Sequence, residues 1–298
     1  MPPSPTQPPD PHPKTPKLRL PAGSIDTHIH LFGPAAQYPF HPDSKYIAAD
    51  ALPEMHIAQQ ETLGLAGAVV VSGGGYGQNS QHLEHVLERF GERFRGVALL
   101  PDDADAAHVE RLDRLGVRGA RFVGTSHKGA LPRLSPRIAA LIAEFGWHVQ
   151  FYPGPDDLLA KSQALLDLPV PVVLDHFACI PAAGGVDQPA FKALLKMLDT
   201  GRVWVKLSGP MRCTPGDYPY APVTSLARAL VAHAPDRLLW GSDWPHVNMN
   251  GRGMPNDGDL VDLLSEWVDT PDALQQILVT NPREVYGQFG SAGPAQHS

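Results

Sequence analysis

The feature that most constrains the fold of this chain is a regular alternation of short apolar runs with amphipathic stretches. Several runs, such as residues 68–71 and 170–174, are continuously apolar, which is typical of strands covered on both faces in a parallel sheet. We predict eight strands, at residues 25–30, 67–72, 95–100, 118–123, 148–152, 172–176, 203–208 and 238–243.

Helix signals lie between these runs. Ser135 and Pro136 form an N-cap followed by proline at the first helical position, and Thr270 with Pro271 repeats that pattern near the end of the chain. A third helix is expected from Pro189 onward, where apolar residues follow at helical spacing. Eight strands separated by helices predict an α/β fold, a (β/α)8 TIM barrel. The main rival is a doubly wound open sheet. Its dinucleotide-binding form is disfavoured because no G-x-G-x-x-G follows the first strand.

The barrel is expected to be a single domain over residues 22–289. Residues 1–21 are rich in proline and charge and lack the apolar run of a secretory signal, so we expect a flexible arm or one draped over the surface. Residues 290–298 are expected to form a flexible tail.

Composition narrows the range of partners. The net charge of -7 and the pI near 6.0 give no basic footprint for nucleic acid. No run of about 18 apolar residues predicts a membrane span. The two cysteines, Cys179 and Cys213, form no C-x-x-C pair, which favours a reducing compartment and a cytoplasmic location. Whether the chain is a monomer or a homo-oligomer is left open.

Ionisable side chains gather where several predicted strands end. The first strand carries Asp26, His28 and His30 at alternate positions, which places them on one face. The sixth strand ends in Asp175 and His176, and the eighth ends in Asp243. Active-site groups of a (β/α)8 barrel come from the carboxyl ends of its strands. We therefore expect these groups to meet at one mouth.

This set of groups suits two chemistries. It can bind one divalent metal with an open position and lower the pKa of a bound water. Alternatively, Asp243 deprotonates water without a metal while the imidazoles polarise a carbonyl. The fifth strand contributes Gln150 and Tyr152 at the same end.

Together these motifs resemble the amidohydrolase superfamily, and within it the amidohydrolase-related (family 2) branch with its 2-pyrone-4,6-dicarboxylate lactonase group. The likeness runs over nearly the whole domain. It rests on residues 23–30, 32–34, 38–40, 45–46, 119–122, 174–176, 240–246 and 281–282.

The resemblance implies hydrolysis of a lactone ring. The aspartate that matches Asp243 is the general base in that group, and the histidines that match His28, His30 and His176 lie beside the lactone carbonyl. The group's lactonase does not depend on a metal. A binuclear centre is disfavoured here because residues 117–123 contain no lysine to bridge two metals. One zinc or manganese ion held by His28, His30 and Asp243, with or without His176, stays open and need not be required.

The resemblance also implies substrate-binding residues for a small anionic lactone. Arg121, Arg212 and Tyr152 match residues that hold substrate in that group. An internal salt bridge for Arg121 and a solvent-exposed position for Arg212 are the competing interpretations. The remaining candidates are a backbone amide at Gly74, a cation at His127 or Lys128 in place of a missing second arginine, and His246, which lines the pocket or caps a turn.

The other histidines, including His56 and His82, fall in predicted helices or loops, where we expect surface roles. Two alternative activities of the same scaffold stay open, a metal-dependent decarboxylase and a lactone isomerase. A non-catalytic anion-binding barrel is disfavoured, because the chain retains His28, His30, His176 and Asp243 together.

Overall fold

The computed structural model describes residues 4–124, 133–154 and 156–290, so His127 and Lys128 lie outside the described residues. Eight parallel strands form one sheet in the order β10-β9-β8-β7-β6-β5-β4-β2. They are β2 (Ile25–Ile29), β4 (Gly67–Val71), β5 (Phe94–Ala98), β6 (Val117–Val123), β7 (His148–Tyr152), β8 (Val172–Leu174), β9 (Val203–Ser208) and β10 (Leu238–Gly241). All eight predicted strands are present, with ends that differ by at most two residues.

The two edge strands meet and nearly close the sheet into a barrel. The backbone N–H of Asp243 donates to the carbonyl of His28 at 2.9 Å, and the N–H of His30 donates to the carbonyl of Trp244 at 2.7 Å. The Thr27 hydroxyl adds a bond of 2.8 Å to the Trp240 carbonyl. The predicted (β/α)8 fold is therefore confirmed, and its seam runs through the two segments that carry His28, His30 and Asp243.

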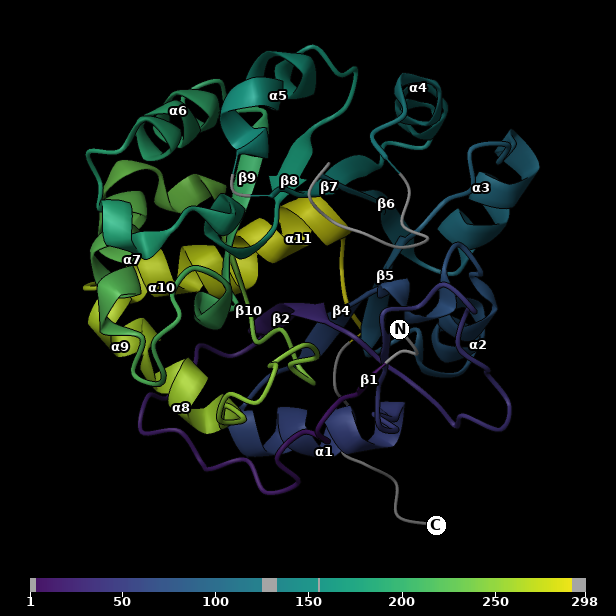
Figure 1. The fold of residues 1–298 in the computed structure, drawn as a ribbon, viewed down its shortest axis with the longest axis horizontal. Helices are drawn as coiled ribbons and strands as arrows, with labels where there is room; N and C mark the ends of the chain where they lie inside the picture. Colours follow the sequence, from purple (N-terminus) through teal and green to yellow (C-terminus); the bar gives the residue numbers. More distant parts are fainter. Residues whose placement is uncertain (1–3, 125–132, 155, 291–298) are drawn as a thin grey trace.

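Helices ring the strands (Figure 1). They are α1 (Pro53–Leu63), α2 (Gln81–Phe90), α3 (Ala106–Arg114), α4 (Pro136–Ala143), α5 (Asp157–Leu166), α6 (Pro189–Leu198), α7 (Ala221–His233), α8 (Asp257–Asp262), α9 (Leu264–Trp267), α10 (Pro271–Gln275) and α11 (Asn281–Tyr286). The expected caps form: Ser135 accepts from the N–H of Ile138, and Thr270 accepts from that of Ala273. Among the described residues, no helix has both the length and the apolar character that crossing a membrane requires.

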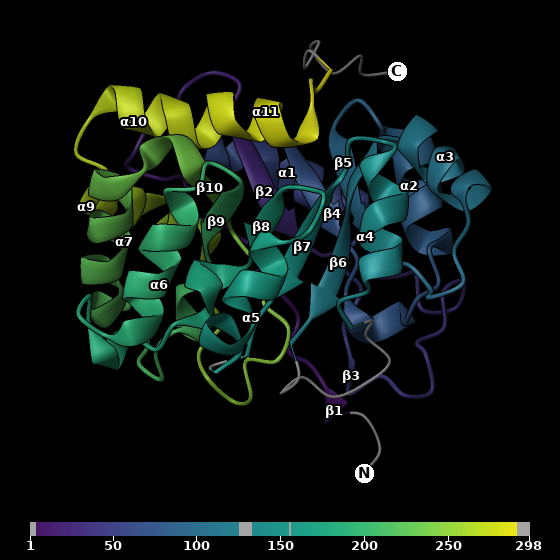
Figure 2. The ribbon, with the colours of Figure 1, turned by 90° about the horizontal axis from the view of Figure 1, so that it is seen from above.

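The barrel has two different ends. Figure 2 shows α11 across one end and the short pair β1 (Ser4–Pro5) and β3 (Tyr46–Ile47) at the other. Tyr286 of α11 is buried against His148, the first residue of β7, with ring centroids 5.2 Å apart. Because His148 opens its strand, α11 covers the amino-terminal end. The carboxyl ends of the strands therefore open toward the side of β1 and β3.

Candidate active site

Three imidazoles converge on one carboxylate at the carboxyl ends of β2, β8 and β10. The Nε2 atoms of His28, His30 and His176 lie 3.8, 3.6 and 3.8 Å from Oδ1 of Asp243. All four residues are at most 5% exposed. The structure thus brings together all four residues for which the sequence predicted a catalytic role.

Asp243 is held in one orientation by an arginine. Its Oδ2 accepts from Nε and Nη2 of Arg212 at 3.0 and 2.8 Å, so the two oxygens of the carboxylate have separate tasks. Burial opposes ionisation, but the Arg212 guanidinium outweighs it and holds the pKa of Asp243 well below its usual range. Asp243 is therefore a carboxylate whose Oδ1 is directed at the three imidazoles.

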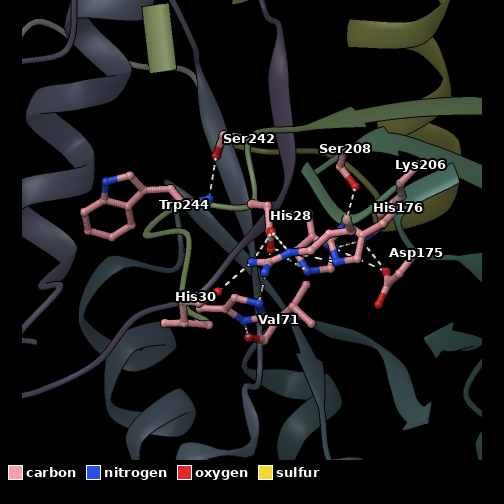
Figure 3. Close-up of polar contacts among 12 residues, drawn as sticks. His28, His30, Val71, Asp175, His176, Lys206, Ser208, Ser242 and Trp244 are labelled. Carbon is pink, nitrogen blue, oxygen red and sulfur yellow. Dashed lines mark hydrogen bonds and ion pairs between the residues drawn. The ribbon is translucent and has the colours of Figure 1, made fainter. Parts of the chain in front are cut away.

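Each imidazole is supported on its outer side (Figure 3). Nδ1 of His30 lies 2.7 Å from the Val71 carbonyl, and Nδ1 of His176 lies 2.9 Å from the Ser208 hydroxyl. Nδ1 of His28 lies 3.2 Å from Oδ1 of Asp175. Burial lowers the pKa of His28 well below its usual value and that of His176 to about 4. His28 and His176 are therefore neutral near pH 7.

The hydrogen bond at Nδ1 of each histidine determines whether its Nε2, which faces Asp243, carries a hydrogen or a lone pair. A carbonyl oxygen only accepts, so Nδ1 of His30 donates to Val71, and in the neutral ring Nε2 is left as a lone pair. Nε2 of His28 is buried and has no hydrogen-bond partner among the described residues. The lone pair of His30, the unpartnered Nε2 of His28 and a carboxylate oxygen thus face one another, an arrangement that a cation between them would stabilise.

The donor set fits one divalent metal ion. One described group of candidate ligands joins His28, His30 and Asp243, with ligand atoms within 4.8 Å of one another. Tetrahedral zinc with ligand bonds of about 2.0–2.1 Å holds its ligand atoms about 3.4 Å apart, close to the separations seen here. The supporting contacts at Nδ1 are also those that orient metal-binding histidines.

Arg121 and Lys206 approach the site through Asp175. Oδ2 of Asp175 accepts from Nε and Nη2 of Arg121 at 3.2 and 3.0 Å. Lys206 is fully buried and donates to the Thr27 carbonyl at 2.7 Å and to Oε1 of Gln150 at 2.9 Å. Burial lowers the pKa of Lys206 to about 7. Arg121 therefore makes an internal salt bridge, which does not conflict with a further contact to substrate.

The other substrate-binding candidates lie around this cluster. Arg121 stacks over the half-buried Tyr152 ring, 5.3 Å from its centroid. His246 is buried, and its Nε2 lies 3.0 Å from Oδ1 of Asp257 in α8. The glycines beside Gly74 have a packing role, since a Cβ at Gly75 would lie 2.7 Å from the Phe40 ring. Gly74 itself is half-buried at the start of a short turn of 3-10 helix.

The prediction that Asp26 lies on the same face of its strand as His28 and His30 is wrong. A register shift interrupts the pairing of β2 with β4 between Asp26 and Ile29. As a result Oδ1 of Asp26 accepts from the backbone N–H groups of His28 and Ser242, both at 3.0 Å, while Oδ2 lies 3.9 Å from His56 in α1. Asp26 therefore faces the helix layer and ties the barrel seam together, instead of sharing a face with His28 and His30.

Sequence reasoning also missed supporting residues. The sequence motifs do not indicate a site role for Ser208 or Tyr46, and they indicate Asp175 only as the neighbour of His176. Tyr46 is buried beside the glycine-containing loop, and burial raises its pKa to about 12. Alternation along the strand at residues 203–208 predicts that Lys206 faces either the barrel mouth or the core and that Ser208 shares its face, but alternation alone does not say which face meets the site.

Comparisons with known proteins agree with this architecture. The sequence profile of the amidohydrolase family (Amidohydro_2) matches residues 25–288. A 2-pyrone-4,6-dicarboxylate hydrolase of Comamonas testosteroni is 36% identical over 290 residues, covering 92% of this chain and 93% of that protein. A 4-sulfomuconolactone hydrolase of Hydrogenophaga intermedia is 33% identical over 273 residues, with 90% of each covered.

A solved structure extends the likeness to three dimensions. The putative 2-pyrone-4,6-dicarboxylic acid hydrolase of Pseudomonas putida superposes with a TM-score of 0.77 and 29% identity, covering 90% of this chain and 98% of that one. The expected family is confirmed by the profile match and by two relatives above 30% identity that cover nine tenths of the chain. This chain belongs to the amidohydrolase family.

Proposed function

We propose that this protein hydrolyses a small lactone that carries a carboxylate or another anionic group. The observation that carries the proposal is the buried Asp243 carboxylate, which three imidazoles face and Arg212 orients. The family and its relatives named as lactone hydrolases support a hydrolase. No observation favours a decarboxylase or an isomerase over this activity.

In the proposed reaction Asp243 is the general base. It takes a proton from water as the water oxygen attacks the lactone carbonyl carbon. The ring C–O bond then breaks, and Asp243 returns the proton to the leaving oxygen, which gives an open-chain carboxylic acid with a hydroxyl or enol group. The imidazoles of His28, His30 and His176 surround the reacting atoms and exclude bulk water.

We further propose that His28, His30 and Asp243, with His176 beside them, hold one zinc or manganese ion. Such an ion, when bound, polarises the carbonyl and lowers the pKa of water. The buried, unpartnered Nε2 of His28 supports this part of the proposal. Arg121, Arg212 and Tyr152 are the proposed contacts to the substrate anion, because guanidinium groups pair with carboxylates through two parallel hydrogen bonds. His246 and Gly74 complete the proposed substrate-binding wall.

The low cysteine count supports a cytoplasmic site of action.

The test is a screen of anionic lactones for ring opening, with decarboxylation and isomerisation followed in parallel. We expect ring opening with the wild-type protein and a loss of at least about 1000-fold in kcat for Asp243→Asn, which keeps the shape of the side chain but removes the base. Circular dichroism of the variant checks that the fold is kept. Release of CO2 or lactone migration without net hydrolysis would overturn the proposal, as would full turnover by the folded variant.

A further inference from the structure

We propose that Asp175 is a positioning residue that fixes the protonated nitrogen of His28 and couples that ring to Arg121. This inference deepens the proposed function, because it describes how the same site aligns its groups. Asp175 is fully buried and lies at the end of β8, directly before His176. It touches two groups with different tasks, a candidate catalytic imidazole and a candidate binding guanidinium.

The two oxygens of Asp175 are divided between these groups. Oδ2 accepts both hydrogen bonds from Arg121. Oδ1 lies 3.2 Å from Nδ1 of His28 and 3.9 Å from Nζ of Lys206, and it is a buried acceptor without a hydrogen-bond partner among the described residues. The paired hydrogen bonds from the Arg121 guanidinium identify Asp175 as a carboxylate. Asp175 is therefore an acceptor on both sides.

That acceptor selects one tautomer of His28. A carboxylate oxygen has no proton to donate, so the 3.2 Å contact is favourable, and the buried Oδ1 gains a donor, when Nδ1 carries the hydrogen. Nε2 of His28 then presents a lone pair toward Asp243, as the neutral ring of His30 does. A tautomer with hydrogen on Nε2 would place two acceptors 3.2 Å apart on the Asp175 side. Asp175 thus sets the chemistry that His28 offers on the opposite edge of its ring.

Lys206 is the competing partner. Its Nζ lies 3.4 Å from Nδ1 of His28 in hydrogen-bond geometry and would select the opposite tautomer by donating to that nitrogen. Two observations favour Asp175. It is closer to Nδ1, and Nζ of Lys206 already donates to Thr27 and Gln150 over shorter distances of 2.7 and 2.9 Å. The two assignments give opposite tautomers, so a spectrum can separate them.

The shared carboxylate also links binding to alignment. Any shift of Arg121 toward a substrate anion changes its hold on Oδ2 of Asp175, and a rigid carboxylate transmits that change to Oδ1 and to His28. Arg121 and Asp175 should therefore be energetically coupled. The loss of kcat/KM in the double variant should be smaller than the product of the losses in the two single variants.

The first experiment records the 15N NMR spectrum of the imidazole nitrogens in the full-length, metal-free protein labelled with 15N-histidine. The signals of His28 are assigned as those that disappear in the His28→Gln variant. We expect hydrogen on Nδ1 of His28 in the wild type. In Asp175→Asn, we expect Arg121 to donate to the amide oxygen, so that the amide NH2 faces Nδ1 of His28. Because that NH2 only donates, the hydrogen of His28 should move to Nε2. Hydrogen on Nε2 in the wild type would overturn the proposal in favour of Lys206. This measurement needs no substrate, so it stands even if lactone hydrolysis fails.

The second experiment is a double-mutant cycle on kcat and KM. Asp175→Asn should lower kcat/KM by about 10- to 100-fold, as supporting residues of such sites do, with kcat and KM both affected. Arg121→Gln should mainly raise KM, and the double variant should lose little more than Asp175→Asn alone. Losses that simply multiply would refute the coupling.

Asp113→Asn is a matched control, because Asp113 also joins an arginine to a ring N–H, accepting from Arg118 at 3.0 Å and from Trp147 at 2.8 Å. It should leave kcat and KM within about twofold of the wild type, since it lies on α3. If Asp175→Asn does not fold, Arg121→Gln replaces it in the spectrum. Arg121→Gln must then shift the 15N signals of His28, whereas the control Arg118→Gln must leave those signals unchanged.

Discussion

At the scale of single residues, the ring of His176 depends on one hydroxyl. Ser208 is buried, and its Oγ lies 2.9 Å from Nδ1 of His176. We expect Ser208→Ala to weaken binding of one divalent ion by about 10-fold or more, because groups that orient a metal-binding histidine contribute that much. A competition titration of zinc against a chromophoric chelator measures the change. Ser225→Ala is the control, since Ser225 is exposed on α7. Equal zinc affinity in wild type and Ser208→Ala would contradict a supporting role for Ser208.

The same scale shows what the sequence could predict. His28, His30, His176 and Asp243 were predictable because active-site groups of a barrel lie where its strands end. Asp26 was not, because an irregularity of strand pairing reverses the face of a side chain and leaves no mark in the sequence. His56 and His82 were expected at the surface, and this is wrong: they are 0% and 6% exposed. Tertiary packing buried them, and helical spacing did not reveal it.

At the scale of elements, the arm before β2 lies against α8 and the segment that follows β10. The backbone N–H of Lys14 donates to Oδ1 of Asn256 at 2.9 Å, and those of Lys17 and Leu18 donate to Oδ1 of Asp262. Residues of the arm also line a cavity of about 440 Å³ together with Tyr46 and His246. The arm is therefore part of the wall on the side of the barrel mouth.

Gly258 offers a way to displace the arm without deleting it. A Cβ at Gly258 would lie 2.1 Å from the Lys14 carbonyl, although alanine is otherwise favourable in a helix. We expect Gly258→Ala to release the arm, to speed tryptic cleavage after Lys14 and Lys17 several-fold, and to raise KM for the lactone. Limited proteolysis followed by mass spectrometry measures the cleavage. Gly253→Ala is the control, since a Cβ there meets nothing within 4 Å. An arm cleaved at the wild-type rate in Gly258→Ala would show that these contacts do not hold it.

At the scale of the whole molecule, stability should depend on buried neutral histidines. Burial lowers the pKa of His82 to about 4 and that of His148 to about 3. Nε2 of His82 donates to the Gly33 carbonyl at 3.1 Å, and His148 lies deep in the barrel beside Tyr286. In the unfolded chain both rings take up protons near pH 6.5. The unfolded state therefore binds more protons than the folded state between about pH 4 and 6.5, and acid favours unfolding.

For His82 alone, the depressed pKa contributes stability that is fully present above about pH 6.5 and is lost as the pH falls toward 4. The loss is about 3 kcal/mol in the free energy of unfolding over that range, with a slope of at most about 1.4 kcal/mol per pH unit. We expect His82→Gln, which can still donate to the Gly33 carbonyl, to reduce the slope by about one proton. Urea unfolding at several pH values between 4.5 and 7.5 measures it. His12→Gln, at an exposed position of the arm, should keep the wild-type slope. If His82→Gln also keeps that slope, His82 takes up its proton in the folded protein as readily as in the unfolded chain, and the acid sensitivity arises from the deeper His148 and its neighbours.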